Sequence, residues 1–433
     1  MIRIEEFARR RERLMSETGE GSITLIAAAA EKLRNGDSYY PFRQDSDFLY
    51  LTGFEEPDAM LVLVPGREAG EQLLFCRERD PERERWDGPR LGVDRAVETL
   101  GVDDAFPIGD LDEIVPGLME GCRRIYHAVG RDAAFDQRII DWRNRVLEDR
   151  KGRAGPAEIV SVDHLLHEQR LIKSHDEIRC MRRAARISAD AMTRAMRACR
   201  PGSTEAGLTA ELLHEYTRHG CPPAYLPIVA GGTNALVLHY VDNRAPLPDD
   251  GLVLIDAGCE FAGYAADISR TFPVGGRFTR PQRDVYEVVL RAQTEAIDRV
   301  RAGTPFEAFH DAAVASLTRG LIDLGLLSGS LEENLDNETW KRFYMHKTGH
   351  WLGLDVHDVG EYRIDDQSRV LEKNMVLTVE PALYIGDEDD IPEPFRNIGI
   401  RIEDDVRVTE DEPEVLTDRV VKSPAEIEGV MAG

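Results

Sequence analysis

The sequence GLVLIDAGCEFAGYAADISRTFPV, residues 251–274, decides the fold of the second half of the chain. Its apolar run LVLID ends in Asp256. After a connection that contains glycines, a second predicted strand begins near Asp267 and continues through SRTFPV. The pattern predicts two strands folded back on each other. A carboxylate at the end of a buried strand needs compensation, because an unpaired buried charge is costly. Two such carboxylates could share a divalent cation, although a hairpin whose acids face water has the same pattern.

Two later segments carry acids on predicted strands in the same way. In NIGIRIEDDVRV the two-residue period of a strand places Arg401 and Glu403 on one face. In VLTVEPALYI the same period groups Glu380 with Thr378 and, across a proline, with Tyr384. A solvated sheet face explains the acids of either strand alone. These acids therefore indicate a functional site only together with other residues of the chain.

A group of histidines precedes both of these strands. The segment HKTGHWLGLDVHDVG, residues 346–360, holds His346, His350 and His357, three of the eleven histidines in the chain. His346 and His350 are four residues apart, but Lys347 stands where the zinc-protease motif HExxH requires glutamate. One packed histidine would need no functional explanation. Three of them close to several acid-bearing strands favour a metal or catalytic site.

The candidate ligands are therefore four acids and one imidazole from separate segments, namely Asp256, Asp267, His350, Glu380 and Glu403. This oxygen-rich set suits Mn²⁺ better than Zn²⁺ or Fe²⁺. Two metal ions about 3.5–4 Å apart would neutralise the acids, polarise a carbonyl and activate a water. The sequence predicts metal-assisted hydrolysis.

Composition narrows the class of protein further. The 433 residues predict two or three domains. The net charge of −26 argues against nucleic acid or an anionic membrane as a partner, and no apolar run approaches the roughly 18 residues that span a bilayer. The six cysteines are scattered without a CxxC pair, which is typical of reduced thiols. We expect a cytoplasmic protein.

The order of predicted elements indicates two domains. Strands such as AMLVLVPG and EQLLFCRE alternate with helical segments, which predicts an α/β domain over residues 1–170. A new helix begins after Ser174, where Ser174 and Glu177 form a capping box. From there, two helices followed by acid-bearing strands occur twice. The pattern predicts an internally duplicated α+β domain over residues 171–433.

These motifs resemble a known family. LIDAGCEFAGYAADISRTFPV, HKTGHWLGLDVHDVG, TVEPALYI and GIRIEDD are similar, in order and spacing, to the pita-bread metallopeptidases. The N-terminal signature YPFRQDSDFLYLTGF, residues 40–54, narrows the resemblance to aminopeptidase P, the Xaa-Pro aminopeptidases. The resemblance covers nearly the whole chain. It implies an α/β N-terminal domain, a pita-bread catalytic domain with internal pseudo-duplication, and removal of the first residue from peptides with proline second.

The resemblance also implies roles for individual residues. It implies two Mn²⁺ ions, with Asp256 on one, His350 and Glu380 on the other, and Asp267 and Glu403 on both. Glu380 accepts a proton from the attacking water, while His239 and His357 stabilise the tetrahedral intermediate. The residues that line the site and orient ligands or substrate are His346, Tyr384 and Arg401.

One further residue bears on assembly. Trp86 resembles a tryptophan that in relatives reaches the active site of a neighbouring subunit, which implies a homodimer or homotetramer. Without the resemblance, Trp86 is more simply a partly exposed structural tryptophan, and His239 a packed histidine.

Other proteins of this fold offer alternative functions. Prolidase shares the ligands but cleaves Xaa-Pro dipeptides. Methionine aminopeptidase lacks the N-terminal domain, and creatinase shares both domains but acts without a metal centre. A catalytically inactive binding protein on this fold would have lost ligands, and all five are present in this sequence.

Overall fold

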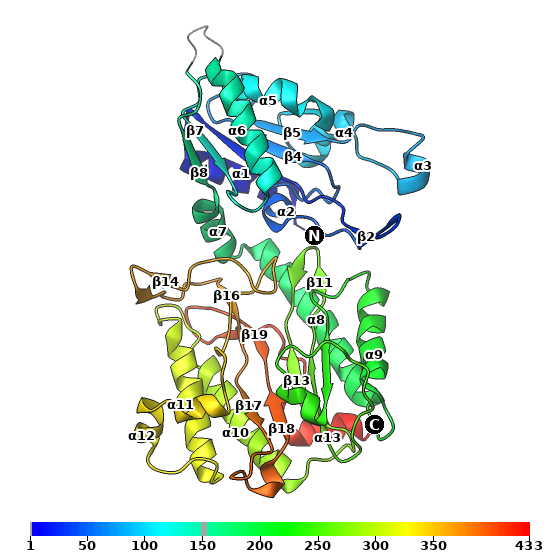
Figure 1. The fold of residues 1–433 in the computed structure, drawn as a ribbon, viewed down its shortest axis with the longest axis vertical. Coiled ribbons are helices and arrows are strands. Elements are labelled where there is room, and N and C mark those ends of the chain that lie inside the picture. The colour runs from blue at the N-terminus through cyan, green and yellow to red at the C-terminus, as the bar shows by residue number, and fades with distance from the viewer. Residues whose placement is uncertain (1, 149–153) are drawn as a thin grey trace. The chain divides into compact units, whose positions relative to one another are not determined.

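The computed structural model describes residues 2–148 and 154–433, and the chain divides into two compact units, Met1–Arg170 and Leu171–Gly433. Figure 1 shows both units, and each has its own sheets and covering helices. Among the helices of the described residues, none is long and apolar enough to cross a membrane.

The first unit is built on a six-stranded mixed sheet with the strand order β6-β5-β4-β1-β7-β8. Neighbours β1–β4 and β4–β5 are antiparallel, and the other pairs are parallel. The strands are β1 Ser22–Ala27, β4 Met60–Leu63, β5 Gln72–Cys76, β6 Asp104–Pro107, β7 Arg124–His127 and β8 Glu158–Ser161, and a separate hairpin pairs β2 Leu33–Asn35 with β3 Ser38–Tyr39.

Helices follow the strands of this unit as the alternating pattern predicts. They are α1 Ile4–Thr18, α2 Ser46–Thr52, α3 Glu84–Asp87, α4 Val93–Leu100, α5 Leu111–Met119, α6 Ala133–Glu148 and α7 Asp163–Leu171. The core joins alternate strand residues such as Ile23 and Leu25 to apolar residues of α5 and α6, including Val115 and Trp142. The period of two on the strands and the helical period on α5 and α6 both bring apolar side chains to this interface.

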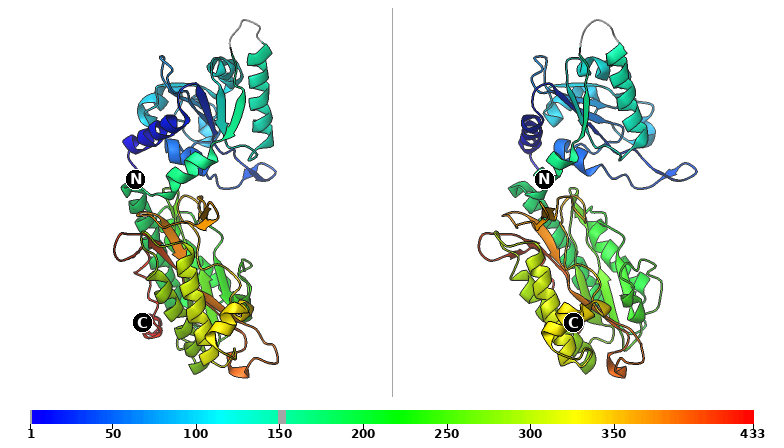
Figure 2. Two further views of the ribbon diagram at one scale, coloured as in Figure 1. Left: turned by 90° about the vertical axis from the view of Figure 1, so that its left-hand side faces the viewer. Right: turned by 60° about the vertical axis from the view of Figure 1, so that its left-hand side comes forward.

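The second unit repeats one order of elements. A helix pair, α8 His175–Ala198 and α9 Glu205–Arg218, precedes β9 Ile228–Gly231, β10 Leu252–Asp256, β11 Glu260–Phe261, β12 Tyr264–Ala265 and β13 Ser269–Pro273. A second pair, α10 Arg280–Ile297 and α11 Glu307–Asp323, then precedes α12 Leu331–Asp336, β14 Arg363–Ile364, β15 Gln367–Ser368, β16 Val376–Val379, β17 Ala382–Ile385, β18 Ile398–Arg401, β19 Asp404–Arg407, β20 Glu414–Val415 and α13 Pro424–Met431. The strands run between the two helix pairs in Figure 1 and in the right-hand view of Figure 2.

The helix start predicted at Ser174 is confirmed, and another helix of this unit begins in the same way. Ser174 and Glu177 form a reciprocal capping box at α8, and Thr279 and Gln282 form one at α10. Each box satisfies two backbone N–H groups that the first helical turn leaves without a partner.

The hairpin predicted for residues 251–274 is present, with one addition. Strands β10 and β13 are antiparallel, and Asp256 lies opposite Ser269. Between them the chain makes the small extra hairpin β11–β12, which the pattern did not predict. A Cβ at Gly258 would lie 1.6 Å from the carbonyl oxygen of Ala266, so only glycine fits at this neck, the base of the β11–β12 hairpin.

Each of the two predicted acid-bearing strands is interrupted at its acid. Glu380 and Pro381 separate β16 from β17, and Glu403 lies between β18 and β19. Proline has no N–H for the ladder. The N–H of Glu380 instead donates to the Thr348 carbonyl (2.7 Å), and that of Glu403 donates to the Ser269 carbonyl (3.0 Å). The prediction of two continuous strands was therefore wrong at these two positions.

Candidate metal centre

All five predicted ligands of the second unit line one pocket. Its volume is about 310 Å³. Three predicted histidines and Arg401 line it as well, so most of the predicted site is brought together. The lining residues are Leu238, His239, Asp256, Asp267, His346, Lys347, Gly349, His350, His357, Glu380, Arg401 and Glu403.

The ligand atoms are closest at the centre of this pocket. Asp267, His350 and Glu403 each offer an atom within 4.8 Å of the other two, and all three are buried. The Nε2 atom of His350 lies 3.5 Å from Oδ2 of Asp267 and 3.8 Å from Oε1 of Glu380. Asp256 joins the group because the Tyr225 hydroxyl lies within hydrogen-bond distance of both Asp256 and Asp267.

Three of the four acids of the pocket lie in an environment that opposes their charge, whereas burial at Asp267 is outweighed by the hydrogen bond and charge of His350, which lower the pKa of Asp267. Burial, together with the neighbouring Asp267, raises the pKa of Asp256 to about 6, despite the opposing charge of Arg401. Burial also raises the pKa of Glu380 to about 7, and that of Glu403 lies well above its ordinary range. Carboxyl groups packed this closely repel one another when ionised. A divalent cation would neutralise part of their negative charge. Carboxylate oxygens with one imidazole are a donor set that fits such a cation.

His350 is oriented for ligation by its backbone. Its Nδ1 atom lies 2.9 Å from the carbonyl oxygen of Trp351, so Nε2 faces the acids. Burial lowers the pKa of His350, but the hydrogen bond to Asp267 and the charge of Glu380 outweigh it and raise the pKa to about 9.

Arg401 connects Asp256 at the end of β10 and Glu403, which follows β18, to the edge of the pocket. Its guanidinium donates to Oδ2 of Asp256 (2.7 Å), to the Tyr384 hydroxyl (2.8 Å) and to Oγ of Ser269 (2.9 Å). Ser269 in turn donates to Oε2 of Glu403 (2.7 Å). One buried cation thus fixes two predicted ligands and the predicted substrate-binding residue Tyr384.

The remaining predicted histidines lie around this network. Nε2 of His346 lies 3.1 Å from the Tyr384 hydroxyl, and burial lowers the pKa of His346 to about 4, so its imidazole is neutral. The rings of His357 and His350 have centroids 4.0 Å apart, and burial with the nearby His350 lowers the pKa of His357. His239 lies on the loop between β9 and β10 and faces the pocket from an exposed position.

Two residues of the site were missed by the sequence analysis. Tyr225 stands in the proline-rich segment CPPAYLP, where nothing indicates a site. Ser269 shares the strand period of Asp267, a signal that could have placed it on the same face. Trp86 lies on α3 of the first unit with 89% of its surface exposed.

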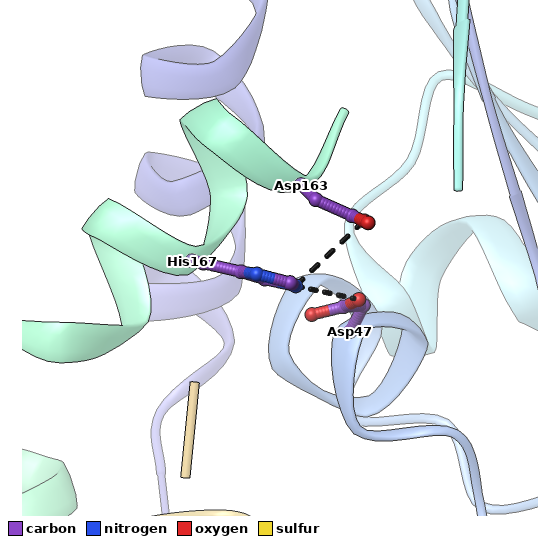
Figure 3. A group of neighbouring side chains, drawn as sticks. All are labelled: Asp47, Asp163 and His167. Atoms are coloured by element: carbon purple, nitrogen blue, oxygen red, sulfur yellow. Dashed lines mark ion pairs between the residues drawn. The ribbon is translucent and has the colours of Figure 1, made fainter. Parts of the chain in front are cut away.

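A second group of metal-ligand residue types lies in the first unit. Figure 3 shows Asp163 and His167 of α7 pointing toward Asp47 of α2, with His167 Nε2 3.7 Å from an oxygen of each acid. The Arg131 guanidinium already lies 2.6 Å from Asp47 Oδ2 and 2.9 Å from both Asp163 Oδ1 and His167 Nε2. Arg170 also binds Asp47, at 2.7 Å. We interpret this group as an ion-pair cluster that joins α2 to α7.

Two family models match the two halves of the chain. Residues 7–126 match the N-terminal domain of aminopeptidase P, and residues 179–410 match metallopeptidase family M24. Together with the acid-rich pocket, these matches define a metallopeptidase of mixed α/β architecture with a pita-bread catalytic part.

Individual relatives agree over the full length. A protein of Escherichia coli strain K12 named Xaa-Pro aminopeptidase is 46% identical, with 99% of this chain and 97% of the relative aligned. The solved structure of Pseudomonas aeruginosa aminopeptidase PepP is 52% identical with a TM-score of 0.98, covering 100% of this chain and 98% of that one. The structure of E. coli aminopeptidase P with the inhibitor Pro-Leu is 45% identical with a TM-score of 0.96 and the same coverage. This chain belongs to the Xaa-Pro aminopeptidases of metallopeptidase family M24.

Proposed function

We propose that this hydrolase removes the N-terminal residue from peptides whose second residue is proline, with two Mn²⁺ ions in the pocket described above. One observation carries the proposal: Asp267, His350 and Glu403 place ligand atoms within 4.8 Å of one another in a pocket whose other acids have raised pKa values. The relative that binds the inhibitor Pro-Leu supports proline as the second residue of the substrate.

The proposed ligands divide between the two ions. Asp256 would hold one ion, His350 and Glu380 would hold the other, and Asp267 and Glu403 would serve both. When bound, the metal ions supply an activated water and polarise the scissile carbonyl. The unusual number of buried acids supports two ions rather than one, because a single divalent cation leaves part of the negative charge uncompensated.

The residues of the chain perform the remaining steps. Glu380 accepts the proton of the attacking water and passes it to the leaving amine. His239 and His357 donate hydrogen bonds to the oxygen on which negative charge develops. His346, Tyr384 and Arg401, which are joined by hydrogen bonds, hold the acids and the proline side of the peptide in place.

Three broader features complete the proposal. The units Met1–Arg170 and Leu171–Gly433 are two domains, of which the second carries the ligands. The fully assembled enzyme is a homodimer or homotetramer in which Trp86 reaches the site of a neighbouring subunit; its 89% exposure supports this role. The enzyme works in the cytoplasm, which the six free, buried cysteines of the chain support.

The test compares Ala-Pro-Ala with Ala-Pro after EDTA treatment and again with Mn²⁺ restored. We expect alanine to be released from the tripeptide, only when metal is present. Cleavage of the dipeptide alone would identify a prolidase instead. If neither peptide is cut by the metal-loaded enzyme, the proposed substrate is wrong. Metal analysis of the same samples then reports whether the site itself binds two ions.

A further inference from the structure

A buried carboxylate outside the pocket holds the loop that carries His239. Glu205 is the first residue of α9 and has 0% of its surface exposed. The loop spans residues 232–246 and forms most of the connection from β9, which ends at Gly231, to β10, which begins at Leu252. The position of Glu205 at a helix N-terminus favours its negative charge, since the helix dipole is positive there.

Four donors from this loop and its stem converge on the two oxygens of Glu205. Oε1 accepts hydrogen bonds from the Gly231 N–H (3.0 Å) and the Asn234 side-chain amide (2.8 Å). Oε2 accepts from the Tyr240 hydroxyl (2.8 Å) and the Ala245 N–H (2.8 Å). The Glu205 N–H also donates to the Ala245 carbonyl (3.0 Å). One carboxylate therefore ties together the two ends and the middle of the loop.

Tyr240 passes this restraint to His239, which directly precedes it. The Tyr240 ring packs against the buried cluster of Ile228, Ala230, Ala235 and Leu254. Its N–H donates to the Val237 carbonyl (3.2 Å), which closes the turn on which His239 stands. His239 itself is exposed, so its position depends on the backbone on either side rather than on side-chain packing.

We propose that Glu205 is a positioning residue of the peptidase reaction, whose carboxylate fixes loop 232–246 so that His239 faces the pocket. The inference rests on the role proposed above for His239. Glu205 has no contact with the five ligands, so its action runs through the loop. An ionised carboxylate only accepts hydrogen bonds, and all four partners here are donors. A glutamine would place an N–H₂ group against two of them.

The charge is therefore as important as the size of this side chain. In E205Q we expect the loop to shift, and a misplacement near 1 Å costs about 10²-fold in rate. The loss should fall on kcat, because His239 acts on the developing charge, and KM should change little. Y240F keeps the carboxylate and removes one donor, so a smaller loss, about tenfold, is expected.

The experiment is a double-mutant cycle in Mn²⁺-loaded enzyme with Ala-Pro-Ala as substrate. The single variants are E205Q, Y240F and H239A, and E205Q/H239A and Y240F/H239A complete two cycles. E211Q is the control, because Glu211 lies on the same helix but pairs with Arg194 and does not contact the loop. Bound metal per chain, melting temperature and amide hydrogen exchange of residues 232–246 are measured for each variant.

If Glu205 acts through His239, E205Q lowers kcat in the wild-type background and changes it by less than about twofold in H239A. Exchange of the loop rises in E205Q but not in E211Q, and metal content stays constant. An equal loss in both backgrounds, or no loss in kcat, overturns the inference. If E205Q does not fold, the Y240F cycle is decided by the same criteria. Full activity of H239A would instead remove the proposed role of His239 while leaving the peptidase itself intact.

Discussion

Lys173 and Asp358 form an ion pair in the interior of the second unit, with Nζ 3.0 Å from Oδ2 and each side chain 1% exposed. Asp358 follows His357, and its N–H donates to the Trp351 carbonyl (2.8 Å). The N–H of Lys173 donates to the Asn374 carbonyl (3.0 Å). The pair thus ties the segment before α8 to the turn that presents His357 to the pocket.

Replacing Lys173 with methionine should destabilise the protein strongly. Breaking a buried ion pair by removing one partner costs about 3–5 kcal/mol in the free energy of unfolding. Guanidinium unfolding measures the change. Lys341→Met is the matched control, because the pair of Lys341 with Glu338 is about half exposed, and such pairs contribute about 0–1 kcal/mol. Equal costs for the two variants would contradict a stabilising role for the buried pair.

Replacing Tyr225 with phenylalanine should weaken metal binding without unfolding the chain. The hydroxyl orients Asp256 and Asp267, and loss of such an outer partner typically costs 10–100-fold in affinity, so a drop of about that size is expected. Calorimetric titration of the metal-free protein with Mn²⁺ measures the affinity. Y264F serves as control, since that buried hydroxyl donates to Glu177 at the start of α8. Unchanged affinity in Y225F would show that the ligands are oriented by other contacts.

Replacing Asp47 with asparagine should destabilise the chain in a pH-dependent way. Burial raises the pKa of Asp47, but His167, Arg170 and Arg131 outweigh this effect and hold it below its ordinary value. A lowered folded-state pKa stabilises the protein above the unfolded value, about 3.9, and the contribution is lost as pH falls through the folded pKa. We expect D47N to cost about 3 kcal/mol at pH 7, and the cost to shrink below about pH 4.

Denaturant unfolding across this pH range checks the result. D163N is the control, since the Asp163 side chain is 33% exposed and its pair with Arg131 should contribute about 1 kcal/mol or less. A cost of D47N that stays constant down to the acid transition, or that matches D163N, would contradict the cluster as we interpret it.

Two inactive variants should restore activity to each other if Trp86 works at a neighbouring site. W86A chains keep their own ligands but cannot complete the next site, whereas E403Q chains keep Trp86 but lack a ligand. Coexpressed chains that form mixed oligomers should cleave Ala-Pro-Ala, while each variant alone loses most of its activity. Light scattering establishes the subunit number. A fully active W86A enzyme, or an active monomer, would refute the shared site.

Part of the site could be predicted because its signals are local. Asp256 ends an apolar strand, and His346, His350 and His357 lie within 12 residues of one another, so composition and spacing were enough to select them. The capping box of α8 is local in the same sense. The matched family then agreed with the fold class inferred from these motifs and the order of elements.

The remaining features depend on contacts between distant segments. Tyr225 is 42 residues from Asp267, Ser269 is 134 residues from Glu403, and Asp358 is 185 residues from Lys173. The periodicity of apolar residues along the sequence does not indicate which distant segments are in contact. The interruptions at Glu380 and Glu403 were missed for the same reason, since their N–H groups bond to Thr348 and Ser269 rather than to a neighbouring strand of the ladder.

The neck at Gly258 has a counterpart at Gly349, where a Cβ would lie 1.9 Å from the carbonyl oxygen of Thr378. Neither glycine offers a ligand atom, yet Gly258 lies in the chain between the proposed ligands Asp256 and Asp267, and Gly349 immediately precedes His350. In a deep mutational scan, both positions should therefore score as intolerant as the ligands themselves. Natural variants at these two glycines would accordingly be grouped with active-site variants, although they act through a backbone collision and not through loss of a reacting group.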